Sequence, residues 1–548
     1  LEFRAYNEGI AYRFISTLGE AFTVENEIAT FNLGKDRKAF IPYVRKNVKT
    51  IEEQFYNTFE NVYTYQAISE WKHGQLSLMP LAIELDHGKK VCITEADLEN
   101  YPGMYLFCSN PGIKAELKGV YAPYPKVEKQ GGHINSQMVV LEREPYIAKC
   151  EGKKDFPWRV LVVSSEDRQL ANNDMVYKLA SSSRVNDISW IKPGKVAWEW
   201  WNDSNLYGVD FKTGINNDTY KYYIGFGIEY VILDEGWSKS RQADLFQVVP
   251  DIDLEELVKY AGERNVGIIL WAGYYAFARD MEKVCKHYSA MGIKGFKIDF
   301  MDRDDQKMVD FHYKAAEMTA KYHLLVDFHG SYKPTGLNRT YPNVINFEGV
   351  HGLEQQKFAD SSIDQVTYDV TIPFIRQLAG PMDYTQGAMR NATKENFAPV
   401  YSEPMSQGTR CRQLAQYVVF ESPLNMLCDS PSNYMKEEEC TKYIATVPTV
   451  WDTTISLAGE IGKYVAIARK SGEDWYIGAM TNWDSRTIEI DFSFLEEGVY
   501  EVDIFEDGMN AHRVAKDYKR KIVDIRSGEK RTFRLAPGGG CAMHIRGK

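Results

Sequence analysis

Acidic residues stand at the ends of several short hydrophobic segments in the middle of the chain. In chain order they are Glu199, Asp234, Glu235, Asp299, Glu348 and Glu354. A single buried carboxylate without a partner is costly, and several close together repel one another. If the fold brings these side chains together, they need a cation, a shared proton or a ligand with many hydroxyl groups.

Lys297 and Asp299 are two residues apart in a strand-like segment, so they point to the same face, while Ile298 points to the other. A structural ion pair would explain them, but a nucleophile that a neighbouring cation keeps ionised explains them better. A Schiff-base lysine, as in an aldolase, is disfavoured because Lys297 stands beside an acid. Asp302, just beyond the segment, is predicted to be the N-cap of the next helix.

Glycoside hydrolysis uses two carboxyl groups that flank the scissile bond. A separation of about 5–5.5 Å gives retention, and a wider gap that admits water gives inversion. Asp299 and Glu354 belong to neighbouring segments and are the candidate pair, although spacing in the sequence leaves their separation open. His329 also ends a segment, which favours a substrate contact over a core position. Asp327 lies deeper and is predicted to be structural.

Hydrophobic strand-like segments alternate with amphipathic helical ones in this region, which is typical of a parallel sheet covered by helices. The predicted strands are Val196–Trp201, Tyr230–Asp234, Gly267–Gly273, Gly295–Phe300, Leu324–Gly330 and Val344–Val350, with weaker ones at Ile372–Ile375 and Leu424–Leu427. Eight units predict a (β/α)8 barrel, whose functional groups gather at the carboxyl ends of the strands. An open doubly wound sheet is the alternative, but no G-x-G-x-x-G follows the first strand.

The flanking regions contain short alternating segments broken by turn residues, which indicates antiparallel β structure. We therefore predict three domains: an N-terminal β-sandwich over residues 1–190, a catalytic barrel over 191–450 and a C-terminal β-domain over 451–548.

The composition supports a folded protein, because charged residues make up 26% and hydrophobic residues 44% of the chain. The net charge of −11 argues against nucleic acid as a partner. The high aromatic content of 13% suits sugar rings, but it also suits cores and sheets.

The eight cysteines contain no C-x-x-C pair, so a zinc site is not expected, and their number leaves the redox compartment open. No apolar segment is long enough to span a bilayer. Leu1 begins directly in strand-like sequence, from which we expect that residues are missing at the front, with a signal peptide among them.

A set of ordered motifs resembles glycoside hydrolase family 97 over essentially the whole chain. The motifs are KPGKVAWEWWND, YVILDEGW, GFKIDFMDRDDQ, FHGSYKPTGLNRTYPN and NFEGVHGLEQQ. The resemblance implies an N-terminal β-super-sandwich, a central (β/α)8 barrel and a C-terminal antiparallel β-domain. It also implies a front domain that begins well before Leu1.

The family contains inverting α-glucosidases and retaining α-galactosidases, and two positions separate them. Inverting members carry a Glu general base after the histidine of the fifth strand, where this chain has Gly330 after His329. Retaining members place an Asp nucleophile within K-I-D-F-M-D, and this chain has Asp299 there. The resemblance therefore implies an exo-acting retaining α-galactosidase that cleaves terminal α-galactosyl residues from oligosaccharides.

By the same resemblance, Asp299 is the nucleophile and Glu354 the general acid and later base. Ca²⁺ is expected as cofactor, with Glu95, Glu348 and Glu354 as ligands, although Gly330 leaves the full ligand set open. The expected substrate contacts are Asp234, Glu235, Lys297 and His329.

Two rival functions remain: an α-glucosidase of the same family, and a catalytically silent carbohydrate-binding protein. Family members resemble periplasmic enzymes, so a periplasmic location is expected. We expect a monomer or weak homo-oligomer, no nucleic-acid partner and no membrane span.

Overall fold

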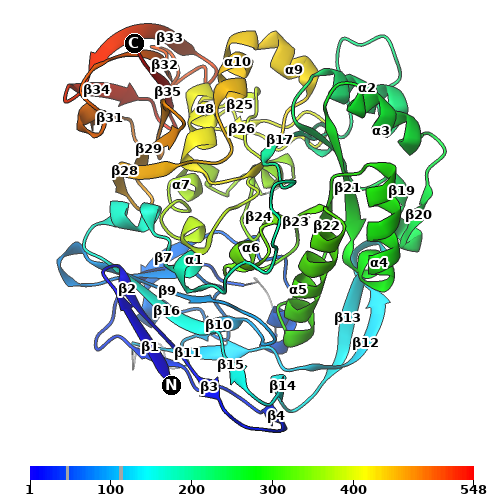
Figure 1. The fold of residues 1–548 in the computed structure, drawn as a ribbon. Coiled ribbons are helices and arrows are strands. Elements are labelled where there is room, and N and C mark those ends of the chain that lie inside the picture. The colour runs from blue at the N-terminus through cyan, green and yellow to red at the C-terminus, as the bar shows by residue number, and fades with distance from the viewer. Residues whose placement is uncertain (45–48, 110–114, 359) are drawn as a thin grey trace.

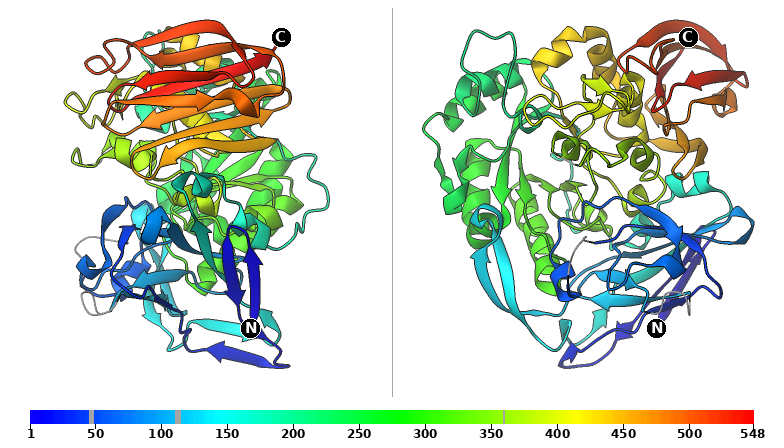
Figure 2. Two further views of the ribbon diagram at one scale, coloured as in Figure 1. Left: turned by 90° about the vertical axis from the view of Figure 1, so that its left-hand side faces the viewer. Right: turned by 180° about the vertical axis from the view of Figure 1, so that it is seen from behind.

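The computed structural model describes residues 1–44, 49–109, 115–358 and 360–548, and three regions follow one another along it (Figure 1). A β-rich N-terminal region and a β-rich C-terminal region flank a central barrel, and Figure 2 shows the same arrangement from the side and from behind. The predicted fold class, a TIM-type barrel between two antiparallel β regions, is confirmed.

The barrel is built from parallel strands in the order β24-β23-β22-β21-β18-β17-β27. Their bounds are β17 (Gly194–Ala197), β18 (Tyr230–Leu233), β21 (Gly267–Gly273), β22 (Gly295–Asp299), β23 (Leu325–Phe328), β24 (Val344–Phe347) and β27 (Leu424–Leu427). Nearly all their residues are buried, as expected for parallel strands that helices cover on the outside and side chains fill on the inside. The carboxyl ends of all seven strands therefore open on one face.

An irregular segment takes the place of the eighth strand between β24 and β27. The amide of Met382 donates to the Glu421 carbonyl at 2.9 Å, and the amide of Asp383 donates to the Phe347 carbonyl at 2.7 Å. The strand predicted at Leu424–Leu427 is confirmed as β27, but the one predicted at Ile372–Ile375 is wrong, because those residues form a turn. The barrel is thus nearly closed, with backbone of residues 382–383 across the gap.

The main helices of the barrel are α2 (Asn217–Gly225), α3 (Leu254–Gly262), α4 (Tyr274–Met291), α5 (Gln306–Lys321) and α8 (Arg410–Val419). The N-cap predicted at Asp302 is wrong, since Asp305 caps α5 and accepts a hydrogen bond from the Met308 amide at 3.3 Å. Asp302 instead accepts a 2.5 Å hydrogen bond from Gln137, which belongs to the N-terminal region. Its carboxylate therefore joins two regions rather than starting a helix.

The N-terminal region contains an antiparallel sheet in the order β1-β2-β16-β9-β8-β6-β7. Its strands are β1 (Glu2–Tyr6), β2 (Gly9–Arg13), β6 (Lys38–Ile41), β7 (Thr64–Ala67), β8 (Leu81–Glu84), β9 (Lys90–Ala96) and β16 (Trp158–Ser164). A hairpin of β12 (Pro125–Gly131) and β13 (Gln137–Arg143) extends from it beside α4 (Figure 1). At the hairpin tip, the Ser136 carbonyl accepts a 2.9 Å hydrogen bond from the amide of Tyr275.

The C-terminal region has a sheet in the order β28-β29-β30-β35-β32-β33. Its strands are β28 (Thr453–Glu460), β29 (Tyr464–Ser471), β30 (Asp474–Thr481), β32 (Val499–Asp507), β33 (Tyr518–Arg526) and β35 (Gly540–Gly547); β31 (Arg486–Asp491) pairs with β34 (Lys530–Leu535). The sheet packs on α8, and Thr409 at the start of that helix donates to Asp507 at 2.6 Å.

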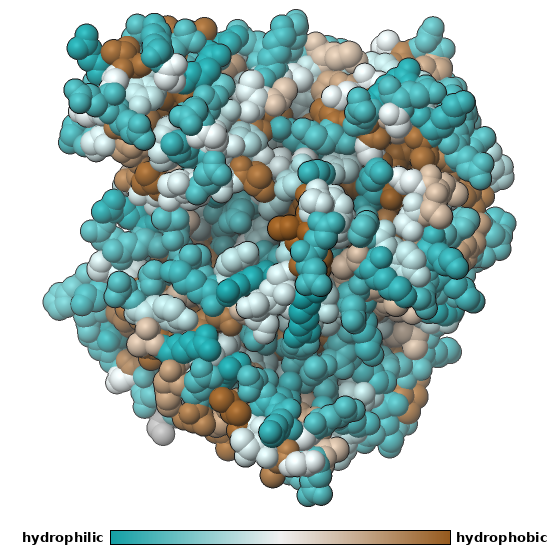
Figure 3. Space-filling model, in the orientation of Figure 1, coloured by the Kyte–Doolittle hydropathy of each residue, from teal (hydrophilic) through white to brown (hydrophobic). Residues whose placement is uncertain are grey.

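The face shown in Figure 3 is mainly hydrophilic, with hydrophobic residues dispersed over it. Within the described part of the chain, the helices are too short or too polar to cross a membrane.

Candidate active site

Asp299 ends β22 at the open face of the barrel, where its side chain is partly exposed. The indole of Trp271 donates to Asp299 Oδ2 at 3.1 Å, and the amide of Phe300 donates to Oδ1 at 2.7 Å. Burial raises the pKa of Asp299 above its ordinary value, against the positive charges of His329 and Lys297, which lower it. Both oxygens are thus held in a fixed orientation beside two cations.

Lys297 lies deeper on the same strand and is almost completely buried. Its Nζ is 2.9 Å from Asp234 Oδ2, which also accepts a 2.7 Å hydrogen bond from the Trp198 indole. Burial lowers the pKa of Lys297, but Asp234 and Asp299 raise it well above its ordinary value. Lys297 is therefore a permanent cation between the ends of β18 and β22. Its ion-pair partner is Asp234, which was not predicted, and its charge also acts on Asp299, the neighbour that the sequence predicted.

Glu199 and Glu235 lie on either side of Asp234. Glu199 Oε1 accepts hydrogen bonds from the Tyr220 hydroxyl at 2.6 Å and the Asp234 amide at 2.8 Å. Burial and the charge of Asp234 raise the pKa of Glu199 to about 7 and also raise that of Glu235. Glu235 is partly exposed and accepts a 3.3 Å hydrogen bond from Ser240. Since Glu235 keeps acceptor capacity at the opening, it is the freer of the two to bind hydroxyl groups.

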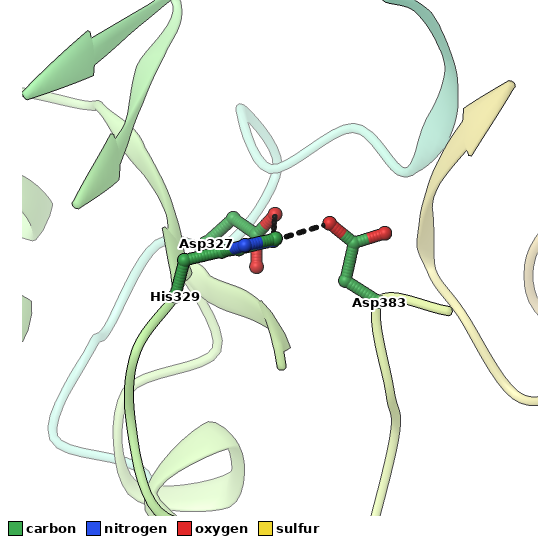
Figure 4. Close-up of side chains that lie close together, drawn as sticks. All are labelled: Asp327, His329 and Asp383. Atoms are coloured by element: carbon green, nitrogen blue, oxygen red, sulfur yellow. Dashed lines mark hydrogen bonds and ion pairs between the residues drawn. The ribbon is translucent and has the colours of Figure 1, made fainter. Parts of the chain in front are cut away.

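His329 follows β23 and lies among three carboxylates, of which Figure 4 draws Asp327 and Asp383. Its Nε2 is 2.6 Å from Asp383 and 3.5 Å from Asp327, and its Nδ1 is 3.3 Å from Glu348. Burial lowers the pKa of His329, but Glu348 and Asp327 raise it well above its ordinary value. Both ring nitrogens therefore already have carboxylate partners, so the sugar contact predicted for His329 would have to share one of them.

Glu348 and Glu354 meet next to His329. One ligand-type atom from each of the three residues lies within 4.8 Å of the others. Burial raises the pKa of Glu348, but His329 and the Gly330 amide, 2.7 Å from Oε2, lower it to about 2. Burial and the neighbouring Glu348 raise the pKa of Glu354 to about 8. One carboxyl group is thus ionised and its neighbour protonated at neutral pH.

Glu60, from a loop of the N-terminal region, joins this pair. Its pKa is raised well above the ordinary value by burial and by the charges of Glu348 and Glu354. Gln355, beside Glu354, donates a 2.5 Å hydrogen bond to Glu60 Oε1. Glu348 and Glu354 bring ligand oxygens within 4.8 Å of each other, and Glu60 is near enough for their charges to raise its pKa. Carboxylate oxygens of this kind are the hard donors that Ca²⁺ prefers.

Glu95 has a different environment from the one predicted. Its Oε2 is 2.8 Å from Arg159, and its Oε1 is 2.8 Å from Lys333. Since two buried cations already neutralise this carboxylate, Glu60 rather than Glu95 is the N-terminal residue that the structure brings to Glu348 and Glu354.

Gly330 has no space for a side chain. Its φ is +51°, and a Cβ atom there would lie 2.7 Å from Asp302 Oδ1 and 2.9 Å from the amide nitrogen of Phe300. Phe300 is the residue whose amide holds Asp299. A glutamate at position 330 would therefore push on Phe300 and displace the candidate nucleophile.

Several residues of the site were not singled out from the sequence. Asp383 comes from the irregular segment that completes the barrel, and Glu60 from a loop; neither follows a periodic strand pattern. His133, at the tip of the β12–β13 hairpin, has its ring 4.7 Å from that of Phe300. Their chain positions carry no signal, since only the packing of distant segments brings them here.

Three family models match the chain. They are described as glycosyl-hydrolase 97 N-terminal over residues 1–182, glycoside hydrolase 97 over residues 200–350, and glycosyl-hydrolase 97 C-terminal, oligomerisation, over residues 450–546.

Among proteins with curated functions, a retaining alpha-galactosidase of Bacteroides thetaiotaomicron is 58% identical over 551 residues, which cover 100% of this chain and 83% of that protein. A probable retaining alpha-galactosidase of Streptomyces bingchenggensis is 29% identical over 512 residues, which cover 92% of this chain and 71% of that protein. Among solved structures, a glycoside hydrolase family 97 enzyme of Pseudoalteromonas sp. strain K8, in complex with acarbose, superposes with a TM-score of 0.86 at 26% identity. The superposition covers 100% of this chain and 85% of the Pseudoalteromonas enzyme.

Proposed function

This chain belongs to glycoside hydrolase family 97, as its motifs predicted, and from that premise we propose that it is an exo-acting retaining α-galactosidase that removes terminal α-galactosyl residues from oligosaccharides. The two curated relatives are named as retaining alpha-galactosidases, one of them as probable, and this supports both the galactoside substrate and the retention of configuration.

One observation carries the proposal: nothing larger than glycine fits at position 330, next to the Phe300 amide that holds Asp299. Asp299 and Glu354 also share two buried cations as neighbours. His329 and Lys297 lower the pKa of both carboxyl groups, so both lie within their electrostatic reach. The residue that would act as base in an inverting member is absent, and its space is filled by Asp302 and Phe300. A direct displacement by Asp299 is the chemistry that these groups support.

In the first step, an Asp299 oxygen attacks the anomeric carbon and forms a β-glycosyl ester as the glycosidic C–O bond breaks. Glu354, whose pKa of about 8 keeps it protonated at neutral pH, gives its proton to the departing oxygen. In the second step, Glu354 takes a proton from water, the water oxygen attacks the same carbon, and the ester bond to Asp299 breaks. Two inversions leave the configuration unchanged.

The sugar hydroxyls would be held by the acids on β18. Asp234 is kept ionised by Lys297 and Trp198, which lower its pKa despite burial. Glu235 lies next to it at the opening. Charge-assisted hydrogen bonds from hydroxyl groups to such carboxylates fix the orientation of the sugar.

Ca²⁺ is proposed as cofactor, with Glu60, Glu348 and Glu354 as protein ligands and water completing the shell. The charge of Glu348 raises the pKa of both Glu60 and Glu354, and a divalent cation would relieve this repulsion between neighbouring oxygen donors. When bound, such an ion would neutralise that repulsion and polarise the region of the leaving group.

The test is the stereochemistry of the product. Hydrolysis of p-nitrophenyl α-galactoside, followed by proton NMR within the first turnovers, should give α-galactose before mutarotation. A first product with β configuration would overturn retention. Faster hydrolysis of the α-glucoside would favour the rival specificity, and no hydrolysis of either would favour the silent binding protein.

We also propose a periplasmic location, from the likeness to the family, and a monomer or weak homo-oligomer. The match of residues 450–546 to a region described as serving oligomerisation supports self-association, which sedimentation velocity would measure.

A further inference from the structure

Three aromatic rings gather at the opening of the barrel and have no part in the proposed chemistry. Trp200 lies in the centre and is partly exposed. Around it, Phe358 is 49% and Tyr401 51% exposed. We call these three residues the aromatic rim.

The rim begins one ring outside the proposed sugar site. Trp198, which donates to Asp234, stacks on Trp200 with ring centroids 5.6 Å apart and an angle of 14°. Phe358 and Tyr401 meet Trp200 edge-on, at 5.9 and 6.3 Å. The rings therefore continue outward from the group that would hold galactose.

Lys357 connects the aromatic rim to the segment that contains Glu354. It lies on the same short helix, η8 (Leu353–Lys357), as Glu354. Its Nζ is 3.9 Å from the centre of the Trp200 ring and 4.0 Å from that of Tyr401, and it donates to the Trp200 carbonyl. Since Lys357 is only 1% exposed, this ammonium is desolvated and its contacts with both rings are strong. The two rings are thus set in place relative to the candidate acid.

We propose that the aromatic rim is the subsite for the leaving-group sugar, a pyranose linked to the terminal galactose; this rests on the proposed function. The acid that protonates the glycosidic oxygen must face the leaving group, and the rim is joined to that acid through Lys357. The apolar C–H face of a pyranose stacks on exposed aromatic rings. Exposed apolar groups also form protein interfaces, but a rim attached to the segment of the acid favours substrate.

The experiment compares two substrates. Galactosyl-α-1,6-glucose fills both subsites, whereas α-galactosyl fluoride has no ring in its leaving group. Tyr401→Ala and Phe358→Ala should each lower kcat/KM for the disaccharide by about three- to tenfold, the value of one stacked ring. Both should leave kcat/KM for the fluoride unchanged. Tyr177→Ala, at a tyrosine of the N-terminal region that is also 51% exposed, is the matched control and should change neither.

Equal losses of kcat/KM on both substrates, or no loss on either, would overturn the proposal that the aromatic rim is the leaving-group subsite. So would a change of oligomeric state in sedimentation velocity, because the rim would then be an interface between copies. Failure of the proposed function looks different: the unaltered protein would then hydrolyse neither galactoside.

Discussion

Replacing Gly330 with alanine adds one carbon atom against Phe300, the residue that follows the candidate nucleophile. The backbone there has φ +51°, and the new Cβ would lie 2.7 Å from Asp302 Oδ1 and 3.1 Å from the Phe300 Cα. Two separate costs follow, one from the left-handed backbone and one from the overlap with the Asp302 carboxylate and with the Phe300 backbone, which cannot rotate away.

The left-handed conformation costs an alanine about 1 kcal/mol, part of which the stiffer unfolded chain offsets. Overpacking against rigid neighbours adds about 1–3 kcal/mol. We therefore expect Gly330→Ala to lower the free energy of unfolding by about 2–4 kcal/mol.

Gly227→Ala provides the matched control. Gly227 also belongs to the barrel region and has φ +80°, but the nearest atom to its added Cβ is the Gly225 carbonyl at 4.0 Å. It should lose only the backbone cost of about 1 kcal/mol. Urea unfolding followed by tryptophan fluorescence would compare the two variants.

Activity gives a second readout, because the overlap pushes on Phe300, whose amide holds Asp299 at 2.7 Å. Gly330→Ala should lose kcat on α-galactosides while Gly227→Ala keeps it. If both variants were destabilised equally and both stayed active, position 330 would have room for a side chain, and the steric reasoning would be refuted.

Four further outcomes are expected. Asp299→Gly should abolish turnover, and azide should restore it by giving β-galactosyl azide; an α-azide product by NMR would contradict retention. Glu354→Gln should slow substrates with poor leaving groups far more than activated aryl galactosides, and equal losses in kcat/KM would count against the acid role. EGTA should lower the rate of hydrolysis and added Ca²⁺ should restore it, whereas a rate that neither reagent changes would refute the proposed Ca²⁺ cofactor. Burial raises the pKa of Asp507 to about 7 from 3.8, so the folded state holds this proton more tightly and the contribution of Asp507 to stability declines as pH rises from about 4 to about 7. The whole effect is at most about 4 kcal/mol. Asp507→Asn should therefore reduce the fall in melting temperature between about pH 4 and about pH 7, and an unchanged pH dependence would show that Asp507 does not cause it.

Strand ends were the part of the site that the sequence could predict. A buried parallel strand reads as a hydrophobic run, and polar residues at its carboxyl end stand out against it, as Asp234, Asp299 and His329 do. The alternation of these runs with helices also predicted the barrel, because each unit is local in the chain.

Loops and irregular backbone could not be predicted in the same way. Asp383 occupies the place of a barrel strand without strand periodicity, and the pattern at Ile372–Ile375 belongs to a buried turn instead. Glu60 and Glu95 are both acids of the N-terminal region, and only the positions of Arg159 and Lys333 decide which one is already neutralised. Such choices depend on contacts between residues far apart in the chain.

The loop of Glu60 and the β12–β13 hairpin give the N-terminal region a share in the pocket. A barrel expressed alone would therefore be an incomplete catalyst, without one carboxylate beside Glu354 and without the imidazole that covers Phe300. Engineers who exchange modules between such enzymes should move both regions as one unit, since a new N-terminal region would bring different residues to Glu354 and Phe300.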